Sequence, residues 1–258
     1  MAVVDVNAEG LRAFTLKEIK RFWSVLGQTV TAPVMTALLY LLVFGQVMKG
    51  RVEVYPGVPY TQFLIPGLIM MSVIQNAFAN SSSSLIQSKL IGNLVFILMA
   101  PLASWELFVG YVGAALLRAG LVGIVLFVAT WPFVHLSVHS LPILLGMFVL
   151  GAGSLAVMGL IAGIVASKFD HLASFQNFLI LPASFLSGVF YSIHSLPAAA
   201  RAASHFNPFF YMIDGFRHGF LGVGDAAVWV CFAWTGGFFA VLSGICLWML
   251  QTGYKLRP

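Results

Sequence analysis

Long apolar stretches dominate this sequence, and the first of them, residues 25–48, contains no charged residue. A helix needs about 20 predominantly apolar residues to cross the hydrocarbon core of a bilayer. Only 8% of the 258 residues are charged and 60% are hydrophobic, whereas about 25% of the residues of a soluble domain are charged. A soluble enzyme, a nucleic-acid-binding domain and a disordered chain therefore fit this composition poorly, and lipid is the expected solvent.

The apolar stretches predict an all-α polytopic membrane protein with six transmembrane helices. The expected spans are residues 25–48, 60–80, 106–131, 141–166, 172–192 and 228–250. The fifth is short and carries Pro182 and Gly188. We expect two parts along the chain, an N-terminal segment, residues 1–24, and a single transmembrane domain, residues 25–258.

The N-terminal segment predicts a basic amphipathic helix over residues 8–23. Its apolar side chains recur at helical spacing, and its basic side chains fall largely elsewhere around the helix; the apolar ones are Leu11, Phe14, Ile19 and Phe22. Such a helix suits an anionic membrane surface. A cleaved signal peptide fits less well, because the apolar run that follows is too long and no small-residue cleavage site comes after it.

The basic residues orient the predicted spans. Six spans place both termini on the same side of the membrane. Eight basic residues fall on that side: Arg12, Lys17, Lys20, Arg21, Lys89, Lys168, Lys255 and Arg257. Four fall on the other side, namely Lys49, Arg51, Arg201 and Arg217. Because cytoplasmic segments carry the excess of Lys and Arg, we expect a multi-pass protein of the inner membrane with both termini in the cytoplasm.

Catalytic and cofactor motifs are absent from the sequence. There is no G-x-x-x-x-G-K-[ST] motif for ATP, and no G-x-S-x-G elbow surrounds Ser154 or Ser187. His135 and His139 flank a loop, but no cysteine or carboxylate nearby completes a metal shell. We expect no catalytic, cofactor or metal site in this chain, and hence no enzyme.

Arg118 is the one charged residue in the interior of an expected span, since Glu106 stands at the start of the same span. It either contacts a substrate or a neighbouring helix, or extends its side chain toward the membrane interface. No acidic residue falls in the interior of a span, whereas an ion-coupled carrier needs such groups. The energy for any transport must therefore enter from outside this chain.

The segment between the last two spans contains two pieces too short to cross a membrane. Pro197 and Pro208 bracket the first piece. The second, residues 209–222, carries Asp214 and Arg217 at i,i+3 spacing. The aromatic side chains here suit either an interfacial anchor without a ligand or an outer gate that closes a pathway.

Three stretches carry a family resemblance. The first comprises residues 39–45 with 60–72 (YTQFLIPGLIMMS). The second runs from MAPL at 99–102 to GYV at 110–112. The third is residues 185–225, which contain FLSGVFYSIHSLP and NPFFYMIDGFRHGFLGVGD. In order and spacing the chain resembles the type 2 ABC exporter permeases, the membrane subunits of drug, polysaccharide and polyketide efflux systems.

The resemblance implies partners that composition does not reveal. Such permeases pair with a separate subunit that binds ATP and Mg²⁺, usually as two permeases with two ATPases. Residues 8–23 would be the interfacial connecting helix, and residues 85–99 the cytoplasmic coupling helix that the ATPase receives. The expected contact residues are Lys89, Leu90, Asn93, Leu94 and Phe96. Because Lys89 is the only charge in that helix, apolar contact must supply most of the affinity.

The resemblance also implies that residues 197–220 form outer re-entrant helices that cap the path. The expected gate residues are Pro197, Asn207, Pro208, Tyr211, Asp214 and Arg217. The expected function is the permease subunit of an ATP-driven exporter, working as a dimer in the lipid bilayer and without a nucleic-acid partner. The alternatives are a self-contained secondary transporter or channel and an intramembrane enzyme. Lipid-linked glycans, drugs and haem-like compounds all remain open as substrates.

Overall fold

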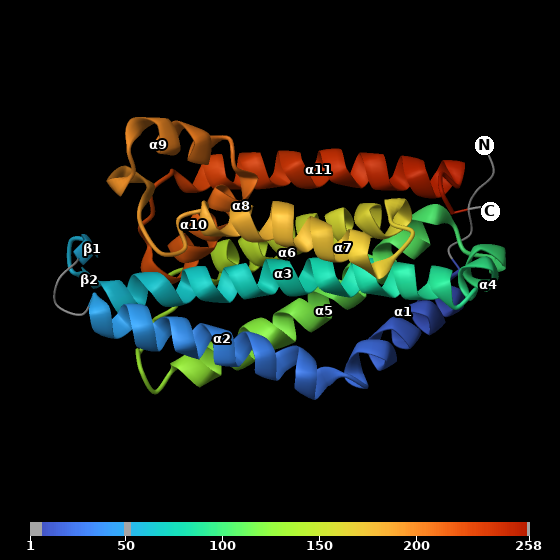
Figure 1. Ribbon diagram of the computed structural model, residues 1–258, viewed down its shortest axis with the longest axis horizontal. Helices are drawn as coiled ribbons and strands as arrows, with labels where there is room; N and C mark the ends of the chain where they lie inside the picture. The colour runs from blue at the N-terminus through green and yellow to red at the C-terminus, as the bar shows by residue number, and fades with distance from the viewer. Residues whose placement is uncertain (1–6, 49–52, 257–258) are drawn as a thin grey trace.

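The computed structural model describes residues 7–48 and 53–256 and consists almost entirely of helices (Figure 1). The α-helices are α1 Ala8–Trp23, α2 Leu26–Val47, α3 Tyr60–Leu90, α4 Leu94–Met99, α5 Ser104–Thr130, α6 Leu141–Val165, α7 Phe169–Phe175, α8 Leu181–Phe185, α9 Ala198–His205, α10 Pro208–Leu221 and α11 Val228–Thr252. A π-helix, η1 (Gln176–Ile180), joins α7 to α8, and a 3₁₀ turn, η2 (Ile193–Ser195), precedes α9. Strands β1 Glu53–Tyr55 and β2 Val58–Pro59 form an antiparallel hairpin. The basic residues Lys49, Arg51 and Arg257 lie outside the described residues.

Five helices of the described chain are long and apolar enough to cross a membrane, namely α2, α3, α5, α6 and α11. They correspond to the predicted spans 25–48, 60–80, 106–131, 141–166 and 228–250. The all-α polytopic architecture predicted from the sequence agrees with this arrangement. The predicted amphipathic helix is also present, because α1 covers the same residues, 8–23.

The predicted fifth span, residues 172–192, has different bounds in the structure. α7, η1 and α8 form one helical run that ends at Phe185, followed by a turn in which Gly188 has a positive φ of 75°. Seventeen residues at about 1.5 Å each give about 26 Å, less than the ~30 Å hydrocarbon core. The sequence placed the end of this helix too late, because the apolar side chains of residues 186–190 continue beyond the helical backbone.

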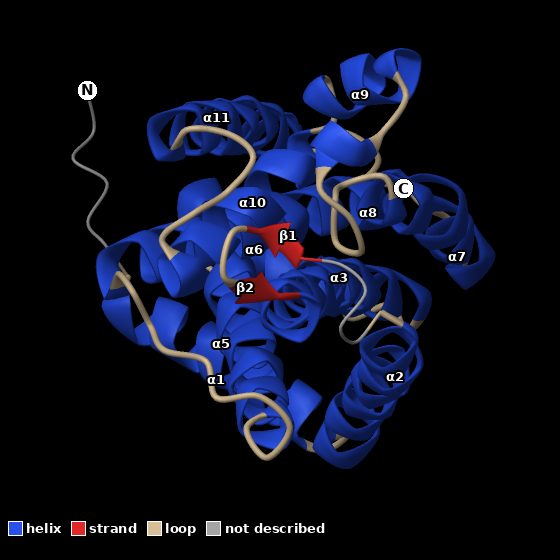
Figure 2. Ribbon diagram, turned by 90° about the vertical axis from the view of Figure 1, so that its left-hand side faces the viewer, coloured by secondary structure: helices blue, strands red, loops and turns tan. Residues whose placement is uncertain are grey.

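The bundle has two distinct ends. One end carries α4, and we call it the α4 end; the other carries the β1–β2 hairpin and α9, and we call it the hairpin end (Figure 1). Figure 2 looks at the hairpin end and shows α3 and α6 in the middle of the bundle, with α2, α11 and α7 around the outside. The long helices therefore connect two surfaces of different character.

Helix α3 is the centre of the fold. Phe63, Leu64 and Ile65 are fully buried although consecutive helical residues point about 100° apart, so α3 is enclosed on all sides. By contrast, Leu39 and Leu42 of α2 and Trp229 of α11 are exposed. Exposed apolar faces on long helices are what contact with lipid or another membrane helix requires.

Two glycines of α6 set its distance from α3. A Cβ atom on Gly159 would lie 2.5 Å from the carbonyl oxygen of Phe78, and one on Gly163 would lie 3.0 Å from the Cβ of Leu85. The two glycines form a small-xxx-small pair, and only glycine leaves room for the α3 backbone at Gly159.

The polar tract of residues 80–84 begins where the expected span of residues 60–80 ends, but it does not end the helix. It lies inside α3, which continues to Leu90, and four of its five side chains are buried: Asn80, Ser81, Ser82 and Ser84. Ser83 Oγ donates to the carbonyl of Asn80, and Ser84 Oγ donates to Glu18 of α1. Ser81 Oγ is buried without a hydrogen-bond partner, and the α3 backbone is helical through the whole tract.

Candidate functional site

The predicted coupling segment, residues 85–99, is not a single helix. Residues 85–90 end α3, a turn through Gly92 with φ 80° follows, and only Leu94–Met99 form the separate helix α4. The end of α3, the turn and α4 expose six large apolar side chains at the end of the bundle: Leu90, Ile91, Val95, Phe96, Leu98 and Met99. We call this set the apolar tip.

The five predicted coupling residues divide into two groups. Leu90, Asn93 and Phe96 are exposed, and Phe96 has 73% of its surface accessible. Leu94 is buried against the bundle. Lys89 turns away from the tip, and its Nζ donates to the carbonyls of Ile164 and Ala166 (3.2 Å to Ala166). Lys89 therefore caps the C-terminal end of α6, where a cation is favourable.

At the hairpin end, α10 is buried within the bundle. It packs against α6, α11 and α3, and its aromatic side chains Phe209, Phe210, Tyr211, Phe216 and Phe220 are all buried. Phe206, just before α10, is exposed. The interpretation of these aromatic side chains as an anchor at the lipid interface therefore fits the exposed Phe206 but does not fit those of α10.

Two predicted gate residues fix the start of α10, and a third, Tyr211, packs the helix against α11. Pro208 occupies the first helical position, and Asn207 caps the helix by accepting the Phe209 amide at 3.0 Å. Asn207 Nδ2 also donates to the carbonyl of Ala183 in α8 at 2.7 Å. Tyr211 stacks on Trp234 of α11, with ring centroids 5.3 Å apart. Pro197, which precedes α9, makes no such contact between helices in the described chain.

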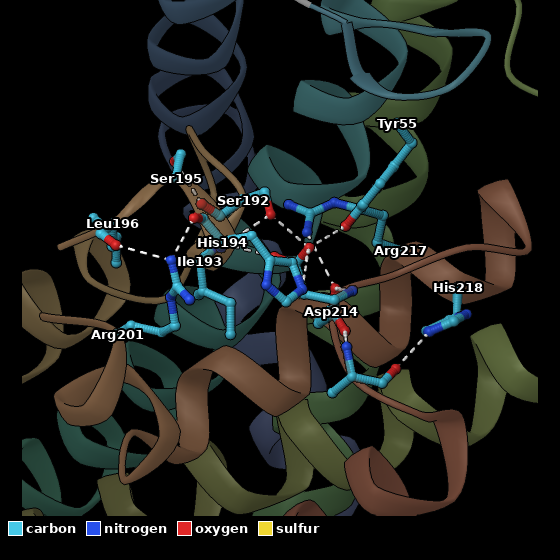
Figure 3. A network of polar contacts seen from close by, with 12 residues as sticks. Tyr55, Ser192, Ile193, His194, Ser195, Leu196, Arg201, Asp214, Arg217 and His218 are labelled. Atoms are coloured by element: carbon cyan, nitrogen blue, oxygen red, sulfur yellow. Dashed lines mark hydrogen bonds and ion pairs between the residues drawn. The ribbon is translucent and has the colours of Figure 1, made fainter. Parts of the chain in front are cut away.

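Arg217 and Asp214 form a buried ion pair inside α10 (Figure 3). Neither side chain is exposed, and Arg217 Nη1 lies 3.4 Å from Asp214 Oδ1. Arg217 Nη2 donates to the carbonyl of Gly188 at 2.7 Å, and the guanidinium lies over the Phe63 ring at 3.8 Å. The pair thus joins α10 to α3 and to the turn after α8.

The two carboxylates of this cluster organise the loops of the hairpin end. Asp214 accepts the backbone amides of Asp225 and Ala226, at 3.0 and 2.8 Å. Asp225 accepts the hydroxyls of Tyr55 and Ser192, at 2.9 and 2.6 Å (Figure 3). Burial raises the pKa of Tyr55, so its phenol stays protonated and donates to Asp225.

Sequence reasoning missed Tyr55, Ser192 and Asp225 as members of this cluster. One signal was present, because Asp225 is a carboxylate in a chain of low charge and lies eleven residues after Asp214. Tyr55 had no such signal, since its partner is 170 residues away.

A second polar network lies between α1 and α3. Glu18 is fully buried, and its carboxylate pairs with Arg21 at 3.1 Å and accepts from Ser84 at 2.5 Å. Arg21 also donates to the side-chain oxygen of Asn80 at 2.9 Å. The buried tract of α3 and the i,i+3 spacing of Glu18 and Arg21 were the available signals for this network.

Arg118 points from α5 toward α3. Its nitrogens lie 3.4 Å from Asn80 Oδ1 and 3.5 Å from Asn76 Oδ1. Of the two interpretations of this residue, the structure favours contact with a neighbouring helix over extension to the interface. Arg118 also lines a polar cavity of about 540 Å³.

The fold and these sites define a polytopic membrane protein. Long helices expose apolar faces, buried polar clusters join them internally, and an apolar tip projects at one end. The ABC-2 type transporter family matches residues 9–221, and the chain belongs to that family.

Three relatives agree with this assignment. Inner membrane transport permease YadH of Escherichia coli K12 is 38% identical over 247 residues, 96% of each chain. Nodulation protein J of Rhizobium leguminosarum bv. viciae is 28% identical over 194 residues, 72% of each chain. The probable multidrug ABC transporter permease YbhR of E. coli K12 is 26% identical over 160 residues, 62% of this chain and 44% of YbhR. The chain is a membrane permease subunit of an ABC transporter.

Proposed function

We propose that this chain is the permease of an ATP-driven exporter and forms the path as a dimer with a separate ATP-binding subunit. The apolar tip carries the proposal. An exposed cluster of six apolar side chains, at the end of α3, on the turn and on a six-residue helix, is the kind of patch that marks a protein interface. It contains no charged side chain, so binding there would depend on apolar contact.

Motion at the tip has a direct route into the bundle. The tip continues α3, which is the central helix, without any linker other than the turn at residues 91–93. Lys89 ties the same turn of α3 to the end of α6. Movement of the tip by an ATPase would therefore reach α3 and α6 together.

In the proposed topology, the α7–η1–α8 run is the fifth of six crossings and both termini are cytoplasmic. The described basic residues support this orientation, because most of them lie on α1 and at the α4 end: Arg12, Lys17, Lys20, Arg21, Lys89, Lys168 and Lys255. The hairpin end has Arg201 and the buried Arg217. The excess of basic residues belongs on the cytoplasmic side. Fusing a reporter to the C-terminus tests the orientation; activity on the outer side would contradict it.

The hairpin end is the proposed outer closure of the path. α9 and α10 are too short to cross a membrane, and α10 enters the bundle and returns through the loop at residues 222–227. The Asp214–Arg217 pair and Asn207 hold that segment against α3 and α8. These contacts support a structured cap that opens as a unit.

A self-contained carrier driven by ions fits less well. Such carriers need ionisable groups that are free to bind the coupling ion. Three buried carboxylates already accept at least two hydrogen bonds or ion pairs each: Glu18, Glu106 and Asp214. Glu106 lies in the first turn of the long helix α5, and it caps the start of that helix by accepting the backbone amides of Asn7 and Ala103.

The proposal is tested by placing a charge on the tip. Phe96→Asp should abolish copurification with the cognate ABC ATP-binding subunit and the ATPase activity of the reconstituted complex. Phe206→Asp is the matched control, because Phe206 is equally exposed but lies at the hairpin end. Loss of the complex in Phe206→Asp alone, or its retention in Phe96→Asp, would overturn the coupling role.

A further inference from the structure

A polar cavity of about 540 Å³ lies between α2, α3, α5, η1 and the end of α1. It extends along α3 from Gln75 to Gln87, a distance of about 18 Å. It therefore reaches from the middle of α3 toward the α4 end. Its lining is rich in amides and cations: Arg21, Gln28, Gln75, Asn76, Gln87, Arg118 and Gln176. Val25, Ala32, Pro33 and Ala79 add an apolar wall.

The cavity has an excess of positive charge. Arg21 and Arg118 reach the same oxygen, Asn80 Oδ1, at 2.9 and 3.4 Å. Glu18 pairs with Arg21 and does not line the cavity. Among the described residues no carboxylate lies within 4.0 Å of Arg118. Glu18 thus pairs with Arg21 and with Lys17, whereas Arg118 has only two long contacts to amide oxygens.

Unused hydrogen-bond donors accompany this charge. Arg118 Nε and Gln75 Nε2 are both buried, and neither has a hydrogen-bond partner. An arginine at membrane depth without a counter-ion is costly, and buried donors normally have partners. A bound group that accepts hydrogen bonds and carries negative charge would satisfy both.

We propose that this cavity binds the anionic head group, phosphate-like or carboxylate, of an amphipathic molecule. Arg118 and Gln75 would donate to the head group, Arg21 would add charge, and the apolar wall would contact the tail. The molecule is either a resident phospholipid or the exported substrate. The second assignment rests on the proposed export function, whereas binding itself does not.

The binding test uses the purified full chain in maltoside micelles with dodecyl phosphate as the probe. Dodecyl phosphate should raise the unfolding temperature, and dodecyltrimethylammonium should not. Arg118→Gln should weaken dodecyl phosphate binding about tenfold or more, as expected for a charged hydrogen bond. Arg118→Lys should keep most of the affinity. Arg12→Gln is the matched control, because Arg12 is exposed on α1 and does not line the cavity.

Stability without an anion is a second measurement. If Arg118 lacks a counter-ion in the free protein, Arg118→Gln unfolds at the same or a higher temperature in anion-free maltoside. A purely structural arginine predicts the reverse, a lower unfolding temperature. Equal affinity of wild type and Arg118→Gln for dodecyl phosphate, or destabilisation of Arg118→Gln without anion, overturns the proposal.

Two further arms identify the source of the head group. Native mass spectrometry after transfer from nanodiscs should show retained phosphatidylglycerol in wild type and less in Arg118→Gln if the ligand is a resident lipid. Stimulation of the reconstituted ATPase by dodecyl phosphate in phosphatidylcholine vesicles, lost in Arg118→Gln, indicates an exported substrate. If Phe96→Asp leaves ATPase coupling intact while anion binding persists, the export proposal fails and the binding site stands.

Discussion

The guanidinium of Arg217 lies 3.8 Å from the ring centroid of Phe63, with no surface of either side chain in contact with solvent. A cation over an aromatic face is stabilised by the ring quadrupole, most strongly where water is excluded. A Cβ on Gly67 would lie 3.2 Å from Arg217 Nη2, so this glycine leaves room for the guanidinium beside α3. The buried guanidinium of Arg217, from α10, therefore packs directly against α3, the central helix of the bundle.

Removing one partner of the Asp214–Arg217 pair should destabilise the protein strongly. Asp214→Ala leaves Arg217 buried without its carboxylate, which costs about 3–5 kcal/mol. The double variant Asp214→Ala/Arg217→Met should lose less than the sum of the two single variants. Cys231 and Cys246 are buried, so their reaction with a thiol dye on heating reports unfolding. Additive losses would show that the two side chains act independently.

Gly159→Ala should destabilise the contact between α6 and α3. The added Cβ would meet the Phe78 carbonyl at 2.5 Å, and backbone cannot move aside as a side chain can. Overpacking of this kind costs about 1–3 kcal/mol. Gly237→Ala in α11 is the control, because nothing lies within 4 Å of its added Cβ. It should be neutral or stabilise by up to about 1 kcal/mol. Equal unfolding temperatures for the two variants would contradict the packing argument.

Lys89→Met should separate the structural role of Lys89 from docking. Loss of the bonds to the carbonyls at the end of α6 should lower stability by about 1 kcal/mol. ATPase copurification should persist, because Lys89 faces α6 and lies outside the apolar tip. Pull-down with the ATP-binding subunit and thermal unfolding measure the two effects. A Lys89→Met protein of normal stability that no longer binds the ATPase would show that Lys89 contacts the partner.

Tyr55→Phe should loosen the hairpin and change the alkaline stability. At neutral pH, loss of the bond to Asp225 should cost about 1 kcal/mol. Because the pKa of Tyr55 is raised in the folded state, its phenol keeps the proton there at a pH at which the unfolded chain loses it, near the ordinary tyrosine pKa of 10.0. Stability of wild type therefore falls as pH rises above 10, and Tyr55→Phe should fall less steeply. Tyr254→Phe, at an exposed position, is the control and should follow wild type.

Much of the fold follows from local sequence. The predicted amphipathic helix has the observed bounds of α1, and five of the predicted spans match long helices. These features depend on apolar content and periodicity, which can be read directly from the order of residues. The end of α3 was predicted wrongly because it depends on which residues the polar side chains near it contact in the folded protein. The tract at residues 80–84 looked like a helix end, yet it is buried because α1 supplies Glu18 as a partner for Ser84.

The predicted gate and coupling residues likewise divide into contacts that local spacing predicts and contacts that depend on the packing of distant helices. Asp214 and Arg217 form a pair that i,i+3 spacing predicts, and they are indeed in contact. Lys89, predicted to contact the ATPase, also caps α6, with acceptor carbonyls 75 and 77 residues further along the chain. No local pattern could identify that acceptor, because a helix end exposes its carbonyls only once its position in the bundle is set.

The sequence by itself determined the solvent, five of the long helices and the family, because these follow from apolar run lengths, charge and motif order. Tertiary structure alone decided which polar groups are satisfied and which are not. Arg118 was a single intramembrane charge with two interpretations until α1 and α3 were placed beside it. In the folded chain Glu18 forms an ion pair with Arg21, and Arg118 faces a cavity. The strength of a charge pair depends on the distance between its charges, which only the packing of the helices sets.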